Sequence, residues 1–270
     1  MISNRSKTSI QKIFKDSSGL SYGNTCNIKF LQAIFDSKHA SKLAFLGGTA
    51  LRIVYGNNRF SEDIDLDNFG LTRTEFGEVI QKVKRFLALE GFEVEVRNVA
   101  KGAYRCYLKI PVLLYEQGLS PLPEEKILVQ VDTTAQGYSY KPETILLNKF
   151  DVFAEIRVTP LNILLSQKIF AAVNRKRTRG RDFYDITYLS SKTKPDLGFL
   201  QQKLGVKTVE GLRKEISTKI AGNDFKDLAD DVAPFLMNKD DIKRSEFCLD
   251  LPKLADCSRV GCTSYFKGIS

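Results

Sequence analysis

The spacing of hydrophobic positions along the chain changes near residue 159. Up to this point, apolar residues occur in short runs or alternate with polar ones, which is typical of β-strands. We expect strands at residues 43–46, 63–67, 92–96, 104–110, 126–133 and 154–158. Helical spacing at 27–40 predicts a helix beside the sheet, and a capping-box pattern at Thr72 opens a second one that ends at Gly91.

Beyond Thr159-Pro160, nearly every segment has helical spacing. We therefore expect an α+β protein. Residues 1–158 would form a mixed sheet with flanking helices, and residues 159–270 a C-terminal helical bundle. Residues 137–150 are predicted to form a loop, which makes 154–158 a last, edge strand.

Composition narrows the class of protein. The 270 residues are 43% hydrophobic and 27% charged, as in globular proteins. The chain has no apolar run long enough for a membrane helix and no apolar signal segment, and its five cysteines are scattered. We therefore expect a cytoplasmic protein without a membrane partner. The net charge of +9 predicts a polyanionic partner.

Residues 63–67 combine strand spacing with acidic side chains. Because side chains alternate along a strand, Asp63, Asp65 and Asp67 share one face. Carboxylates on one face repel one another unless a cation lies between them. Hard oxygen ligands of this kind suit Mg²⁺, which also leaves coordination positions for substrate phosphates.

A glycine turn precedes this acidic strand. Gly47 and Gly48 follow the apolar strand 43–46 and lead into a short helix that begins near Thr49. Free backbone N–H groups and the positive end of a helix dipole are suited to phosphate. A phosphate-binding turn beside metal-ligating acids indicates an enzyme that uses a nucleoside triphosphate.

These residues resemble a known signature. Gly47-Gly48, a spacer and Asp63-Ile-Asp65 are similar to the G-[GS]…hDhDh pattern of DNA polymerase β-like nucleotidyltransferases. Gly-Gly-Thr-Ala-Leu-Arg followed by Arg59-Phe-Ser-Glu-Asp-Ile-Asp-Leu resembles the AbiEii/MenT-type toxins more closely. The resemblance covers about residues 43–190. It implies transfer of a nucleoside monophosphate to RNA, with tRNA as the acceptor, and a cognate antitoxin that restrains the enzyme.

The resemblance also implies roles for individual residues. In such enzymes a third carboxylate, on a later strand, lies next to the acidic pair, and Asp132 matches it in position and strand phase. Asp63, Asp65 and Asp132 would then hold two Mg²⁺ ions, and Asp132 would activate the attacking hydroxyl. The alternative is an aspartate that only ends a strand. Asp67 is expected to be peripheral.

The phosphates of the nucleotide would contact the turn formed by Gly47, Gly48 and Thr49. The usual G-S pair is G-G here, so a hydroxyl has to come from Thr49 or Ser61. Lys168 is the further candidate, because it lies on the apolar face of the helix expected at 160–175. Lys168 either reaches the triphosphate or extends its ammonium from the core to solvent.

A basic run follows that helix. Five of the seven residues from Arg175 to Arg181 are basic. Arg175, Lys176 and Arg177 are predicted to bind RNA backbone, and Arg181 to bind nucleotide. Asp182, in the Arg-Asp-x-x-Asp pattern that the toxins share, is a candidate catalytic residue, and Asp185 a weaker one. The alternatives are a solvated turn and acids that favour a helix N-terminus.

Two other functions use the same residues. One is a regulator that binds nucleotide or RNA on a degenerate transferase fold, although a binder gains nothing from three repelling acids. The other is a phosphotransferase that acts on protein, since a similar site can move a γ-phosphate.

Overall fold

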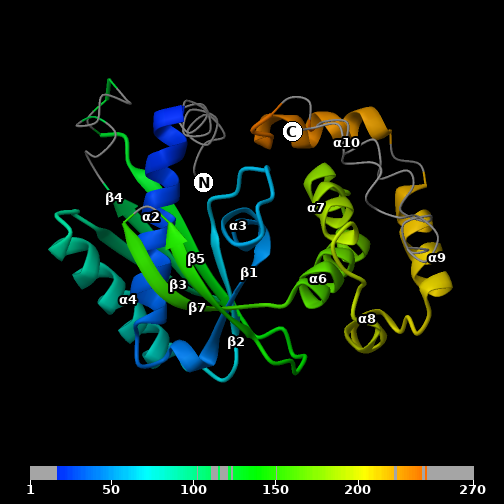
Figure 1. Ribbon diagram of the computed structural model, residues 1–270, viewed down its shortest axis with the longest axis horizontal. Helices are drawn as coiled ribbons and strands as arrows, with labels where there is room; N and C mark the ends of the chain where they lie inside the picture. The colour runs from blue at the N-terminus through cyan, green and yellow to red at the C-terminus, as the bar shows by residue number, and fades with distance from the viewer. Residues whose placement is uncertain are drawn as a thin grey trace. The chain divides into compact units, whose positions relative to one another are not determined.

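The computed structural model describes residues 17–101, 103–110, 115, 121–122, 124–149, 151–221, 224–238 and 241 (Figure 1). The chain forms two compact units. The first contains the chain up to Gly56 and residues Phe60–Thr159, and the second contains Asn57–Arg59 and the chain from Pro160 onward. No described helix has the length and apolar character that crossing a membrane requires.

The first unit is built on a seven-stranded mixed sheet. Its strands are β1 (Leu43–Leu46), β2 (Ile64–Asn68), β3 (Glu95–Lys101), β4 (Ala103–Ile110), β5 (Ile127–Thr134), β6 (Glu143–Lys149) and β7 (Val152–Val158). They are arranged in the order β3-β4-β5-β2-β1-β7-β6. The pairs β2–β5 and β1–β7 are parallel, and the other pairs are antiparallel. This sheet and the helices confirm the predicted α+β class.

Helices α2 (Ser17–Phe35) and α4 (Arg73–Leu89) cover the apolar face of this sheet (Figure 1). The predicted capping box opens α4: the Thr72 hydroxyl accepts from Glu75 N, and the Glu75 carboxylate accepts from Thr72 N. The core side of β5 consists of alternating buried residues, whereas Asp132 on the opposite side is partly exposed. Strand β5 therefore has one buried apolar face and one partly exposed polar face, which carries Asp132.

The second unit is helical, as predicted. Its helices are α6 (Leu161–Asn174), α7 (Gly180–Ser190), α8 (Leu197–Leu204), α9 (Val209–Ile220), α10 (Phe225–Val232) and the 3₁₀-helix η2 (Ala233–Phe235). Asp196 and Thr208 cap α8 and α9 with their side chains. The short segment Asn57–Arg59 joins this unit through a β-bridge between Arg59 and Leu236.

Two predictions about the sheet are wrong. Residues 143–149 form strand β6 instead of a loop, and β7 lies inside the sheet, between β1 and β6, instead of at its edge. The cause is the high exposure of β6. Only Leu147 is buried, so this edge strand shows no clear alternation of buried apolar and exposed polar residues. The expected loop at 111–125 and the tail after residue 238 lie mostly outside the described residues.

Candidate active site

Three charged side chains form one row across the polar face of the sheet. Asp65 in β2 is the register partner of Asp132 in β5, and Asp132 is the register partner of Arg105 in β4. Register partners project from the same face of a sheet. The two acids that the sequence assigns to different strands are therefore direct neighbours, and an arginine stands next to them.

The Asp132 carboxylate is held by a planar pair of hydrogen bonds. Arg105 donates from Nε to Oδ1 at 2.7 Å and from Nη2 to Oδ2 at 2.8 Å. Gln130 also donates to Oδ2, at 2.8 Å. The hydrogen bonds that Arg105 donates to Asp132, together with the charge of Asp132, raise the pKa of Arg105. Asp132 therefore has a cation beside it even without a metal ion.

The glycine turn lies directly against Asp65. Gly47 has a φ of +82°, and a Cβ atom at this position would lie 2.2 Å from Oδ2 of Asp65. Only glycine fits both the backbone conformation and the space. The turn and the acidic strand, which are separate in the sequence, thus form one compact site.

Helix α3 (Gly47–Ile53) carries the other predicted phosphate-binding residues. Gly48 and Thr49 are buried in its first turn. The Thr49 hydroxyl donates to the Ser61 hydroxyl at 3.0 Å. The two hydroxyls that the sequence offered as alternatives are therefore hydrogen-bonded neighbours.

The fit of a metal ion rests on the chemistry of these acids. Within the described part of the chain, no three acidic, cysteine or histidine side chains gather into a metal-binding cluster. Asp65 and Asp132 are nevertheless paired in register, and Asp63 is exposed just before β2. One or two carboxylates, completed by water and phosphate oxygens, suffice for Mg²⁺. The donor set therefore fits magnesium.

Asp67 has a structural environment. It is 2% exposed and accepts hydrogen bonds from Gln136 N at 3.0 Å and from the Tyr140 hydroxyl at 2.8 Å. The Tyr140 hydroxyl also lies 2.8 Å from Thr159 Oγ1. Asp67 thus fastens the segment after β5 to β2, which agrees with the peripheral role expected for it.

The second unit contains the other group of predicted site residues, around a buried carboxylate. Asp185 in α7 is fully buried and lies 2.7 Å from Lys168 Nζ. It also accepts two hydrogen bonds from Arg59 at 2.8 Å and one from Asn57 at 2.9 Å. Burial alone raises the pKa of Asp185, but the charges of Arg59 and Lys168 outweigh this effect and lower it to about 2. The lysine on the apolar face of α6 thus has an anionic partner.

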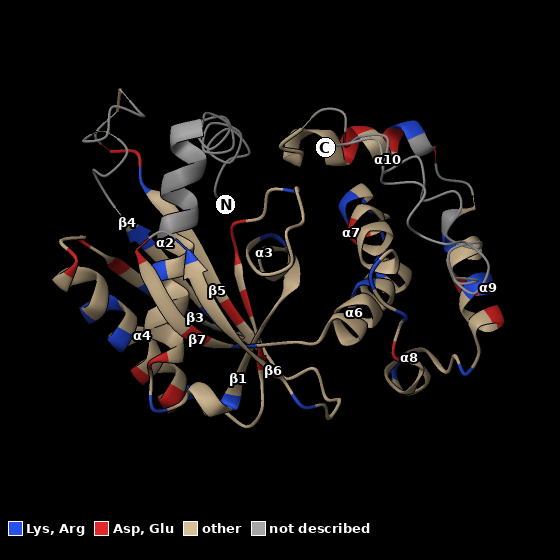
Figure 2. Ribbon diagram, in the orientation of Figure 1, with Lys and Arg blue, Asp and Glu red and all other residues tan. Residues whose placement is uncertain are grey.

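Asp182 lies one turn earlier in α7 and is 2% exposed. Its Oδ2 atom is 3.2 Å from Nη1 of Arg175. Burial and the neighbouring Arg59 lower the pKa of Arg181, although Asp182 opposes this shift. In Figure 2, blue segments mark the basic residues that surround the start of α7. Lys176 and Arg177 are exposed to solvent there.

Sequence reasoning missed three members of these groups. Arg105 lies in a strand for which the sequence predicted no functional residue. Arg59 and Asn57 lie in the connector between α3 and β2. Asp185 was ranked below Asp182, yet it accepts more hydrogen bonds than Asp182 does among the contacts described. The Arg-Asp-x-x-Asp pattern was the available signal for Asp185. No local signal identifies Arg105, since its role depends on strand register.

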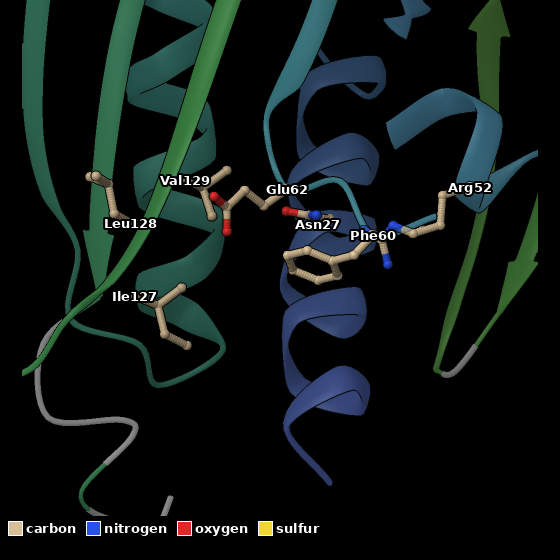
Figure 3. Close-up of a pocket in the computed structure, with 7 residues that line it drawn as sticks. All are labelled: Asn27, Arg52, Phe60, Glu62, Ile127, Leu128 and Val129. Carbon is tan, nitrogen blue, oxygen red and sulfur yellow. The ribbon is translucent and has the colours of Figure 1, made fainter. Parts of the chain in front are cut away.

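A small cavity lies in the first unit, between residues of α2, the connector after α3 and β5 (Figure 3). Its volume is about 10 Å³, which is room for about one water molecule. The lining residues are Asn27, Arg52, Phe60, Glu62, Ile127, Leu128 and Val129. The guanidinium of Arg52 lies 5.5 Å from the centre of the Phe60 ring. None of the predicted site residues lines this cavity.

Comparison with known proteins identifies the family to which the chain belongs. The model of the family described as "Nucleotidyl transferase AbiEii toxin, Type IV TA system" matches residues 29–247. No curated protein sequence matches the chain.

Two solved structures share this fold, and a third is more weakly similar. JHP933 from Helicobacter pylori is 15% identical, with a TM-score of 0.57 over 89% of this chain and 92% of that one. A candidate nucleotidyltransferase from H. pylori is 16% identical, with a TM-score of 0.58 over 88% and 93%. The toxin MenT4 from Mycobacterium tuberculosis is 17% identical, with a TM-score of 0.48 over 88% and 87%.

Proposed function

Since the chain belongs to the AbiEii nucleotidyl transferase toxin family of type IV toxin–antitoxin systems, we propose that it transfers a nucleoside monophosphate to RNA. The donor is a nucleoside triphosphate and the acceptor a hydroxyl of tRNA. The observation that carries this proposal is the pairing of Asp65 with Asp132 beside the Gly47 turn. Carboxylates suit the metal ions that assist phosphate transfer, and backbone N–H groups at the start of a helix suit the phosphates of the donor.

In this reaction the acceptor hydroxyl forms a bond to the α-phosphorus, and the bond to the pyrophosphate oxygen breaks. The proton of the hydroxyl passes to Asp132. Asp63, Asp65 and Asp132 would hold two Mg²⁺ ions. When bound, these ions supply neutralisation of the charge on the phosphates and on the attacking oxygen.

The residues of the turn orient the donor. Backbone N–H groups at Gly47 to Thr49 and the hydroxyls of Thr49 and Ser61 are the proposed phosphate donors. Roles for Lys168, Asp182 and Arg181 in nucleotide binding or catalysis stay predictions. The ion pairs of Lys168 and Asp182 within the second unit support at least a structural role for both.

The acceptor is proposed from charge. The net charge of +9 and the exposed Lys176 and Arg177 favour a polyanion such as tRNA. The type IV toxin family implies an antitoxin that counteracts this activity. If no nucleotide is transferred to RNA, the alternative functions are a phosphotransferase that acts on protein and a regulator without enzymatic activity.

The proposal is tested by incubating the full chain with total RNA, Mg²⁺ and each α-labelled nucleoside triphosphate in turn. We expect label in RNA of tRNA size, with Asp65→Asn and Asp132→Asn inactive and Thr144→Ala, exposed in the edge strand β6, active. Label transferred to protein from a γ-labelled triphosphate, with none in RNA, would instead establish a phosphotransferase.

A further inference from the structure

Arg105 contacts both carboxylate oxygens of Asp132, the atoms with which Asp132 would bind a metal ion. Both oxygens of Asp132 are engaged, Oδ1 by Arg105 Nε and Oδ2 by Arg105 Nη2 and Gln130. The three charged residues of the row, Asp65, Asp132 and Arg105, leave the sheet on one face. A second cation at Asp132 would stand within a few ångströms of the guanidinium, where like charges repel strongly.

We propose that Arg105 is a positioning residue that holds Asp132 while the site is free of metal and has to release it when a divalent cation binds. Arg105 therefore sets the cation concentration at which the site fills. This inference rests on the proposed metal site of Asp65 and Asp132 and assigns a control residue to it.

The exposure of Arg105 makes this exchange feasible. Its side chain is 42% exposed, so the guanidinium can move into water without losing a buried environment. Exposed ion pairs contribute little net stability. A divalent cation, by contrast, is attracted by the negative charges of both carboxylates, Asp65 and Asp132. The Arg59–Asp185 pair gives the contrast: with side chains 4% and 0% exposed, it has no water to move into.

The experiment measures binding of Mn²⁺ alone, by electron paramagnetic resonance, to the full chain without nucleotide. Arg105→Gln should bind Mn²⁺ about fivefold more tightly than wild type, because the competing charge is gone. Lys109→Gln is the matched control. Lys109 lies on the same strand and face but is paired with Leu128 instead of Asp132, so its loss should change the affinity less than twofold by general charge effects.

Two further variants separate this inference from the proposed function. If Asp65→Asn and Asp132→Asn weaken Mn²⁺ binding while Arg105→Gln leaves it unchanged or weaker, the metal site stands and the role of Arg105 is wrong. If Mn²⁺ binding does not depend on Asp65, both the metal site and the role of Arg105 are overturned. Equal tightening by Arg105→Gln and Lys109→Gln also overturns the specific role.

Discussion

The carboxylate of Asp185 accepts a two-pronged pair of hydrogen bonds from the guanidinium of Arg59, which lies 126 positions earlier in the chain. Both residues are buried, and Asn57 and Lys168 complete the contacts of the carboxylate. This ion pair explains why Asn57–Arg59 belongs to the helical unit although the flanking residues belong to the sheet.

Asp185→Asn should reduce stability by roughly 3–5 kcal/mol, because Arg59 and Lys168 are then buried without their counter-charge. The effect depends on pH in a defined direction. The folded-state pKa of Asp185 is about 2, below the unfolded value of about 3.9. The stability from this pair is therefore fully present above about pH 4 and is lost as the pH falls toward 2.

Urea unfolding at several pH values would check this prediction. The difference in unfolding free energy between wild type and Asp185→Asn should be constant from pH 7 to about 4.5 and shrink by roughly 2 kcal/mol below it. A difference that stays constant down to pH 2 would contradict the assigned ion pair.

Gly47→Ala should slow nucleotide transfer more than its effect on folding explains. The new Cβ would displace the Asp65 carboxylate, 2.2 Å away, and such a displacement can cost about 100-fold in rate. Gly70→Ala is the control, since Gly70 has a φ of +88° but no atom within 4 Å of an added Cβ. Both variants lose about 1 kcal/mol from backbone strain. Comparable transfer rates in the two variants would show that Asp65 tolerates the displacement.

Gly180→Ala should destabilise the helical unit by about 1–3 kcal/mol. A Cβ at Gly180 would lie 1.8 Å from the carbonyl oxygen of Leu228, and Gly180 N donates to Asp231. The close approach of α7 to α10 therefore requires glycine. Gly77→Ala in α4, where an added Cβ has no neighbour within 4 Å, should instead stabilise the chain by about 0.5–1 kcal/mol. Thermal unfolding of both variants measures the contrast.

The exposed pair Lys176 and Arg177 should contribute to RNA binding through counterion release. Changing both to Ser should flatten the slope of log K against log salt by up to about 1.4. Arg175 is left intact because it pairs with Asp182. Changing the exposed Lys207 and Lys214 of the same unit to Ser is the charge-matched control. Equal slopes for the two double variants would show that Lys176 and Arg177 do not bind RNA specifically and that the basic run is a solvated turn.

Local sequence was sufficient for several elements. The bounds of β1 were predicted to the residue, and the Thr72 capping box was confirmed with its helix, because short-range spacing and side-chain capping determine both. The strand phase also placed Asp65 and Asp132 on one type of face. These features depend on residues within a few positions of one another, so they can be read without knowledge of the fold.

The tertiary structure decided the rest. Strand β6 is held by its pairing with β7, and its exposed position leaves no apolar alternation to detect. The neighbours of Asp132 and Asp185 were set by strand register and helix packing, which bring Arg105 and Arg59 to them from distant parts of the chain. The sequence by itself supplied the side chains that are proposed to carry the chemistry. Only long-range packing determined which charged side chains are neighbours. Contacts between residues far apart in the chain do not affect the local spacing of apolar residues, so they cannot be predicted from it.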